Sequence, residues 1–181
     1  MPGNPPPLQD PEAFSKLYAR THLVIFRFVY GLHGGPVQEV EDLASETYMR
    51  AWRGRSRFRG DEEDAFRWLF TIARHLVIDA HRRRKSHRED DNDLLDDTML
   101  DESFVSTQEK PEELAASREQ FRLLWARVLN LPLEKRELLV LRYMLGWQVK
   151  QIARYVDMQE NTVSVTLRRI IEQLRRDFPL L

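Results

Sequence analysis

The stretch AFRWLFTIARHLVIDAHRRRK, residues 65–85, decides the fold class of this chain. At about 100° per residue its apolar side chains share one helical face, and a cationic stripe lies beside that face. The apolar set is Phe66, Leu69, Phe70, Ala73, Leu76, Val77 and Ala80. The cationic stripe is Arg67, Arg74, His81 and Lys85, and Arg82, Arg83 and Arg84 close the segment. The pattern predicts an amphipathic helix that packs on one flank and is positively charged on the next.

Two further helices are expected before this one. Asp10, Pro11 and Glu12 give an N-cap, a proline in the first turn and an acid beside it, so a helix begins here and ends within residues 31–36. Residues 37–52 form a second helix with one packed face, made by Val40, Leu43, Ala44, Thr47, Tyr48, Ala51 and Trp52. Residues 53–64 are charged and contain two glycines, which predicts a loop.

The last third of the chain predicts four more helices. They cover residues 112–129, 133–145 with Gly146 as C-terminal cap, 148–156 and 160–176. The last two are separated by a tight turn at residues 157–159, which is a helix-turn-helix pattern. The side chains expected to bury between them are Ile152, Ala153, Val156, Met158, Val163 and Leu167. Since no segment alternates with period two, we predict an all-α protein made of two small helical domains.

Charge divides the 181 residues into three parts, although the net charge is only −1. Residues 1–88 hold 15 basic against 11 acidic side chains, residues 89–113 hold 1 against 11, and residues 114–181 hold 12 against 7. We therefore expect a disordered lead over 1–9, domains over 10–88 and 114–181, and a flexible acidic linker over 89–113. The linker is either a plain solubilising tether or a competitor of nucleic acid for the basic domains.

Composition excludes several classes of protein. The chain has no cysteine, which removes disulfide scaffolds, thiolate catalysis and cysteine-ligated metals, and favours a cytoplasmic protein. No apolar run approaches the roughly 18 residues that a membrane span needs. His75 and Asp79 lie one helical turn apart and His81 follows, which could suggest a metal site, but the sequence fixes no third ligand for it. No glycine spacing matches a nucleotide-binding loop. We expect no enzyme activity, no metal and no cofactor.

The two domains suit two modes of nucleic-acid binding. The helix-turn-helix would place its second helix in a major groove, unless it is an ordinary hairpin with a solvated basic face. The first domain combines arginines with Phe58, Phe66 and Trp68, and such a set favours single strands because bases stack on aromatic rings. The alternative is that Trp52, Phe66 and Trp68 are simply part of the core.

The sequence resembles a known family in both domains. Residues 41–52 (EDLASETYMRAW) and 66–79 (FRWLFTIARHLVID) with the arginine run that follows look like region 2 of bacterial sigma-70 family sigma factors, of the extracytoplasmic-function (ECF) class. Residues 131–136 (LPLEKR), the pair Ile152-Ala153 and the pair Thr162-Val163 resemble region 4 of the same family. The two resemblances occur in the family's order and cover nearly all of the chain outside the lead and the linker.

This resemblance implies a sigma factor, with core RNA polymerase and promoter DNA as partners and an anti-sigma factor as a further one. The clamp coiled coil of the largest subunit would bind Asp42, Leu43, Glu46 and Arg50, and the polymerase flap would contact region 4. The minus-10 element would be recognised and opened by Arg57, Phe58, Arg59, Arg67, Trp68, Arg74, His81, Arg82, Arg83, Arg84 and Lys85. The minus-35 element would be read by Lys150, Gln159, Glu160, Asn161, Thr162, Ser164, Arg168 and Arg169.

Four positions depart from the family pattern. Ser45 stands where glutamine is usual, His75 where asparagine is usual, and Asp157 where glycine is common. Residues 164–166 (Ser-Val-Thr) replace the lysine and arginine often found in the recognition helix, so we expect weaker or unusual minus-35 recognition. The alternative to a sigma factor is a stand-alone helix-turn-helix regulator, for which the basic first domain and its acidic helix would have no purpose.

Overall fold

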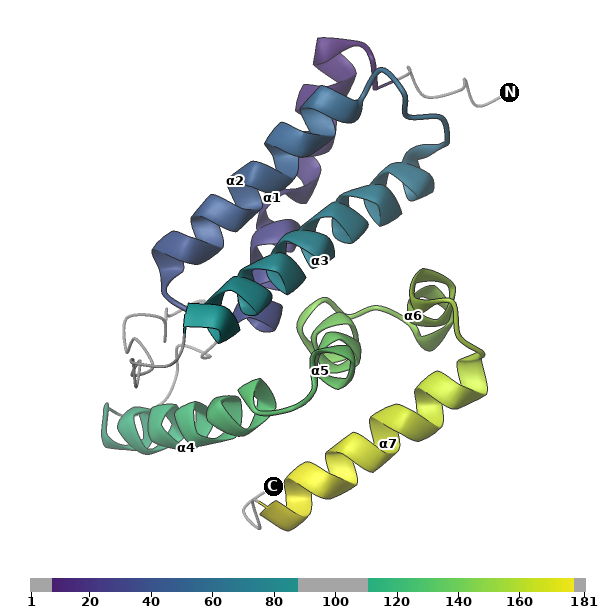
Figure 1. Ribbon diagram of the computed structural model, residues 1–181. Helices are drawn as coiled ribbons and strands as arrows, with labels where there is room; N and C mark the ends of the chain where they lie inside the picture. Colours follow the sequence, from purple (N-terminus) through teal and green to yellow (C-terminus); the bar gives the residue numbers. More distant parts are fainter. Residues whose placement is uncertain (1–7, 88–110, 178–181) are drawn as a thin grey trace. The chain divides into compact units, whose positions relative to one another are not determined.

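The computed structural model describes residues 8–87 and 111–177, and the chain divides into two compact units, Met1–Leu94 and Leu95–Leu181. Every regular element within the described ranges is helical, which confirms the all-α prediction (Figure 1). The predictions for residues 1–7 and for most of the linker, including its competition with nucleic acid, lie outside the described residues. Leu8 is described and is only 9% exposed, so the end of the expected lead packs against the first unit.

The first unit consists of three helices that pack against one another: α1 (Pro11–His33), α2 (Val37–Gly54) and α3 (Glu62–His87). The predicted N-cap is confirmed, because the Asp10 carboxylate accepts a hydrogen bond of 3.2 Å from the Glu12 N–H. The helix continues through the buried Gly31 and ends at Gly34, whose φ of 64° is left-handed. The loop between α2 and α3 covers residues 55–61 and is shorter than expected at both ends.

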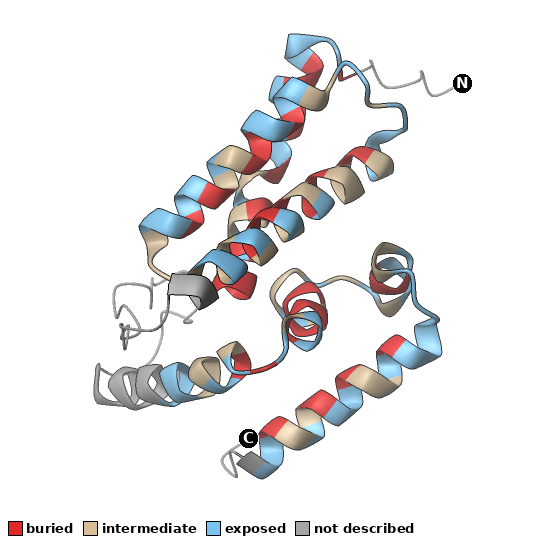
Figure 2. Cartoon of the chain, viewed as in Figure 1, coloured by how far each residue is buried: buried red, intermediate tan, exposed pale blue. Residues whose placement is uncertain are grey.

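Apolar stripes of the three helices form the core of the first unit (Figure 2). Phe28 and Phe70 are fully buried and meet edge to face with ring centroids 4.7 Å apart. The buried Thr21 hydroxyl donates to the Leu17 carbonyl at 2.7 Å and accepts from the Tyr48 hydroxyl at 2.8 Å, so this polar pair is satisfied. Burial, the largest cause, raises the pKa of Tyr48 to about 12.

Four residues of the predicted packed faces of the second and third helices are more exposed than expected, and one of them is Ala44, which is half-buried. Phe66 and Ala80 are half-buried and lie toward the two ends of the α3 stripe, whose buried residues run from Ala65 to Val77. Trp52 is 38% exposed since it lies in the last turn of α2, where its ring meets Phe14 edge to face with centroids 5.1 Å apart. The other expected core residues of α3 are buried as predicted.

The second unit contains α4 (Pro111–Leu129), α5 (Leu133–Leu139), a π-helical turn η3 (Val140–Met144), α6 (Val149–Val156) and α7 (Glu160–Asp177). The expected helix over 133–145 is confirmed, but its last turn is wider than an α-helix, because the Leu145 N–H donates to the Val140 carbonyl at 3.0 Å. Gly146 then takes a φ of 70°, as its predicted capping role requires.

The helix-turn-helix is formed by α6 and α7. Ile152, Ala153, Val163 and Leu167 are buried, as predicted, whereas Val156 is only half-buried. Asp157 ends α6 with φ 55° and ψ 50°, so it takes the left-handed place that glycine often fills. The expectation that Met158 is buried is wrong: it is 40% exposed, because the left-handed step at Asp157 takes the chain away from the buried face of α6.

Candidate nucleic-acid interfaces

The cationic flank of α3 is partly occupied by contacts within the chain. Arg67 forms an ion pair with Asp64, whose pKa is lowered by its hydrogen bonds to the Asp61 backbone and to Arg67. The His81 ring nitrogen Nε2 lies 3.2 Å from the Leu32 carbonyl, and Arg74 is half-buried. Arg82 and Arg83 are exposed, and Lys85 lies in the same helical turn. The exposed positive charge of α3 is therefore concentrated at its carboxyl end.

An aromatic pair joins the loop before α3 to the first part of this helix. The rings of Phe58 and Trp68 stack with centroids 5.0 Å apart and an interplanar angle of 26°. Gly54 makes room for this pair, since an added Cβ would come within 3.2 Å of the Trp68 ring. Arg57 and Arg59 are exposed beside the pair, and Arg59 donates to the carbonyls of Ser56 and Phe58 at 2.8 and 2.7 Å. The structure thus brings two of the three predicted stacking residues, Phe58 and Trp68, together near the amino end of α3, whereas the Phe66 ring faces Arg20.

A second aromatic contact was not anticipated from the sequence. The Arg55 guanidinium lies 3.4 Å from the centroid of the Trp52 ring, a cation–π arrangement. The Arg55 Nη1 also donates to the Trp52 carbonyl at 2.6 Å. The spacing of three residues at the end of a helix is the signal that could have indicated it.

The exposed face of α2 is acidic, and the Glu46–Arg50 ion pair lies on it. Asp42 is exposed, and Glu46 is half-buried and accepts a hydrogen bond of 2.9 Å from Arg50 Nε. Leu43, predicted as a polymerase contact, is only 9% exposed and belongs to the core. Met49, which follows Asp42 and Glu46 on the same side of the helix, is 49% exposed and was missed in the sequence reasoning.

The candidate readers in the second unit are all exposed. Lys150 lies on α6, and the others lie in the turn and along the first half of α7: Gln159, Glu160, Asn161, Thr162, Ser164, Arg168 and Arg169. Arg168 has an acidic neighbour, with Nε 3.7 Å from Glu172 Oε1. Val165 and Thr166 are half-buried, so only Ser164 of the Ser-Val-Thr segment is fully on the exposed face. The exposed face formed by these residues is polar, and its positive charge on α7 comes from Arg168 and Arg169, the last two of them along the helix.

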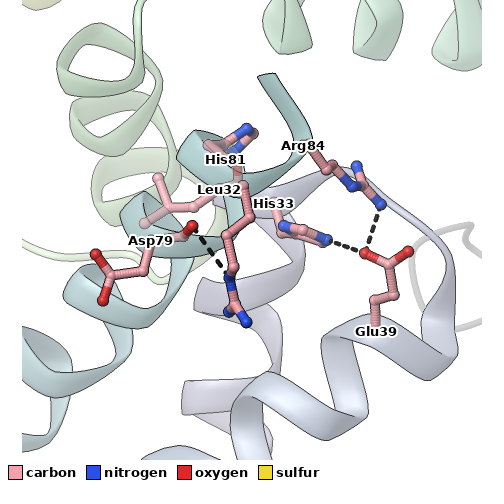
Figure 3. A network of polar contacts seen from close by, with 7 residues as sticks. Leu32, His33, Glu39, Asp79, His81 and Arg84 are labelled. Atoms are coloured by element: carbon pink, nitrogen blue, oxygen red, sulfur yellow. Dashed lines mark hydrogen bonds and ion pairs between the residues drawn. The ribbon is translucent and has the colours of Figure 1, made fainter. Parts of the chain in front are cut away.

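A polar network joins the three helices of the first unit, and no sequence pattern indicated it. Glu39 on α2 receives His33 Nε2 at 2.9 Å and Arg84 Nη2 at 2.6 Å, both on its Oε2 atom (Figure 3). Burial raises the pKa of Glu39, but the hydrogen bond from His33 and the charge of Arg84 outweigh it, so this pKa lies below its ordinary value. Burial also lowers the pKa of His33, whose side chain is fully enclosed.

The first unit has an aromatic pair near the amino end of α3 and exposed arginines at the carboxyl end of the same helix, and the second unit has a helix-turn-helix. Together they define a DNA-binding protein with two separate contact surfaces. Within the described ranges, no group of three histidine, aspartate or glutamate side chains is arranged to hold a metal ion. The helices of these ranges also include none with the length and hydropathy that a bilayer crossing requires.

Comparison of the sequence with known proteins shows to which family of DNA-binding proteins the chain belongs. Residues 17–87 match the family sigma-70 region 2, and residues 121–174 match sigma-70 region 4. The chain is 32% identical over 160 residues to the ECF RNA polymerase sigma factor SigL of Mycobacterium tuberculosis, which covers 88% of this chain and 85% of SigL. The chain belongs to the ECF sigma factors, which direct promoter recognition and transcription initiation, so the alternative of a stand-alone regulator is not favoured.

Other relatives agree with this assignment. The ECF sigma factor SigX of Bacillus subtilis is 28% identical over 178 residues, with 94% of this chain and 86% of SigX covered. Among solved structures, the sigma factor RpoE of Bartonella quintana, in complex with the anti-sigma factor NepR, has a TM-score of 0.63 at 18% identity and covers 91% of this chain and 96% of its own. CnrH, in complex with the cytosolic domain of CnrY, has a TM-score of 0.57 at 20% identity, with 94% and 90% covered. These structures share the fold, and the relatives are sigma factors rather than catalysts.

Proposed function

We propose that the two units divide the work of initiation between them. The first unit docks on core RNA polymerase through α2. It captures the opened minus-10 element along α3, from the loop at the amino end of this helix to the arginines at its carboxyl end. The second unit reads the duplex minus-35 element through α7 and contacts the polymerase flap. Within the first unit, the observation that supports separate surfaces for polymerase and DNA is the distribution of exposed charge, which is acidic on α2 and basic on α3.

The docking surface on α2 is Asp42, Glu46, Arg50 and Met49, all on the outward side of the helix. Leu43 supports this surface from beneath, because its side chain packs in the core. An acidic face suits the clamp coiled coil of the largest subunit if that element offers cations. The Glu46–Arg50 pair at 2.9 Å keeps the carboxylate ordered at the surface.

Strand capture falls to the aromatic pair and the exposed arginines. Phe58 and Trp68 offer stacking surfaces, and stacking contributes about 1 to 3 kcal/mol for each base. Arg57, Arg59, Arg82 and Arg83 are exposed and can contact phosphates along the strand. Arg67, Arg74, His81 and Lys85 complete the cationic flank of the helix and contribute mainly through their charge.

Duplex reading falls to the first half of α7, with Lys150 of α6 on the phosphates. Gln159, Asn161 and Ser164 can form hydrogen bonds with base edges, and Arg168 or Arg169 can contact the backbone. Because the face holds few cations near its N-terminus, we propose that this unit binds the minus-35 element weakly by itself.

The family and its solved relatives also suggest a regulator. RpoE and CnrH are held by NepR and CnrY, and we propose that a protein of the same kind holds this chain inactive in the cytoplasm until a signal releases it. Such an inhibitor would compete with polymerase for the exposed face of α2.

The experiment that tests polymerase docking is a charge reversal on α2. Asp42→Arg with Glu46→Arg should weaken binding to core polymerase by about a hundredfold or more, since like charges brought together at an interface cost several kcal/mol. Glu41→Arg, exposed on the same helix, is the matched control and should keep most of the affinity. Pull-down with core enzyme and reconstituted transcription measure the effect, and full affinity in the double variant would refute the docking surface.

A further inference from the structure

The three arginines at the end of α3 are not equivalent. Arg82 and Arg83 are exposed, whereas only 28% of the Arg84 side chain is exposed. Arg84 Nη2 reaches back 2.6 Å to Glu39 Oε2, at the start of α2 and 45 residues earlier in the chain. Figure 3 shows the guanidinium directed toward this carboxylate. One of the three candidate phosphate contacts therefore already has an anion bound to it.

The position of this ion pair is built into the turn between α1 and α2. An added Cβ on Gly35 would lie 2.5 Å from Arg84 Nη2 and 2.9 Å from the His33 ring, so only glycine leaves room for the guanidinium there. On the other side, the buried His33 donates from Nε2 to the same Glu39 oxygen, because a carboxylate can only accept. The carboxylate is thus held in place from α1 while it binds Arg84 of α3.

We propose that Glu39 acts as an internal competitor of DNA phosphate for Arg84. This inference depends on the proposed role of the α3 end in binding DNA. With Glu39 in place, a phosphate that approaches the arginine run meets two available cations, and the third is neutralised by a carboxylate of the same chain. Glu39 therefore weakens nonspecific binding by the free chain and leaves the reach of Arg82 and Arg83 unchanged.

The expected size follows from counterion release. Each phosphate contact adds about 0.7 to the slope of log affinity against log salt for single strands, and about 0.9 for duplex. Releasing Arg84 by Glu39→Gln should therefore steepen the slope by about 0.7 on a single-stranded oligonucleotide of random sequence. Relative to 1 M salt, this amounts to roughly a fivefold gain in affinity at 0.1 M. Glutamine has the shape of glutamate and can still accept hydrogen bonds from His33 and Arg84, so the fold should be kept.

The test uses the full-length free chain and five variants, with anisotropy titrations at several salt concentrations. Glu39→Gln should bind more tightly and with a steeper slope than Glu41→Gln, which makes the same charge change on an exposed residue two positions further along α2. In the Glu39→Gln background, Arg84→Ala should abolish the gain. Glu39→Asp keeps the charge but shortens the side chain, so it should show part of the gain.

Three results would overturn the proposal: equal effects of Glu39→Gln and Glu41→Gln, a gain that persists without Arg84, or weaker binding by Glu39→Gln. The last would mean that Glu39 presents Arg84 to DNA instead of withholding it. The double variant Arg82→Ala with Arg83→Ala distinguishes a failure of the competitor role of Glu39 from a failure of the proposed DNA-binding role of α3. If the double variant lowers the salt slope by about 1.4 while Glu39→Gln has no effect, the DNA-binding role stands and the competitor role falls. If neither changes the slope, both are wrong.

Discussion

Ala153 is the residue on which the packing of the helix-turn-helix depends most directly. It is 4% exposed, and its carbonyl accepts hydrogen bonds from the turn, from the Asp157 N–H and from the Met158 N–H at 2.9 Å. Replacing it with tryptophan adds an indole where α6 meets α7. Because α6 has only eight residues and is held by this contact, it cannot shift without losing the turn as well.

Overfilling a packed site costs about 1 to 3 kcal/mol in ordinary cases, and an indole in place of a methyl group falls at or above the upper end. A domain of the size of the second unit has a stability of roughly 3 to 10 kcal/mol, at about 0.05 to 0.15 kcal/mol for each residue. Ala153→Trp should therefore remove a third or more of the stability of the second unit and leave the first unit intact.

The assay is thermal unfolding followed by far-ultraviolet circular dichroism, together with amide spectra that resolve the two units. We expect the transition of the second unit to move to lower temperature or to vanish, while the signals of α1, α2 and α3 persist. Lys150→Trp, at an exposed position of the same helix, is the control and should melt like the native chain. A native transition in Ala153→Trp would refute the packing of α6 on α7.

Two further predictions concern the first unit. Phe70→Ala should destabilise it by about 3 to 5 kcal/mol, because the ring is fully buried against Phe28, and a urea midpoint equal to that of the native chain would contradict this. Burial lowers the pKa of His33 below 6.5. Below about pH 6.5 the His33 side chain therefore binds a proton in the unfolded chain more readily than in the folded chain. The free energy of unfolding should fall as the pH drops through this range. The loss is at most about 1.4 kcal/mol for each pH unit. His33→Gln should reduce this pH dependence of the free energy of unfolding, measured by urea titrations between pH 5 and 8. This window lies above the range in which Glu39 loses its charge.

Several features of the site were readable from local sequence. The N-cap at Asp10 depends on neighbours within a few residues, and so does the left-handed turn at Asp157. The outward position of Asp42 follows from helical period alone. The stacking of Phe58 on Trp68 was expected only as a shared surface, because the loop geometry that brings the rings to 5.0 Å is not periodic.

The sequence by itself determined the helices, the two-domain division of charge and the family, because each of these depends on periodicity, caps and motifs within short stretches. Only the tertiary structure decided which charges are available. Arg84 has the same sequence surroundings as Arg82 and Arg83, yet it alone of the three is paired with Glu39, 45 residues away. Such a pairing arises from the way α2 and α3 pack, and no local pattern records it. The number of free cations that this sigma factor offers to DNA is therefore a property of its fold.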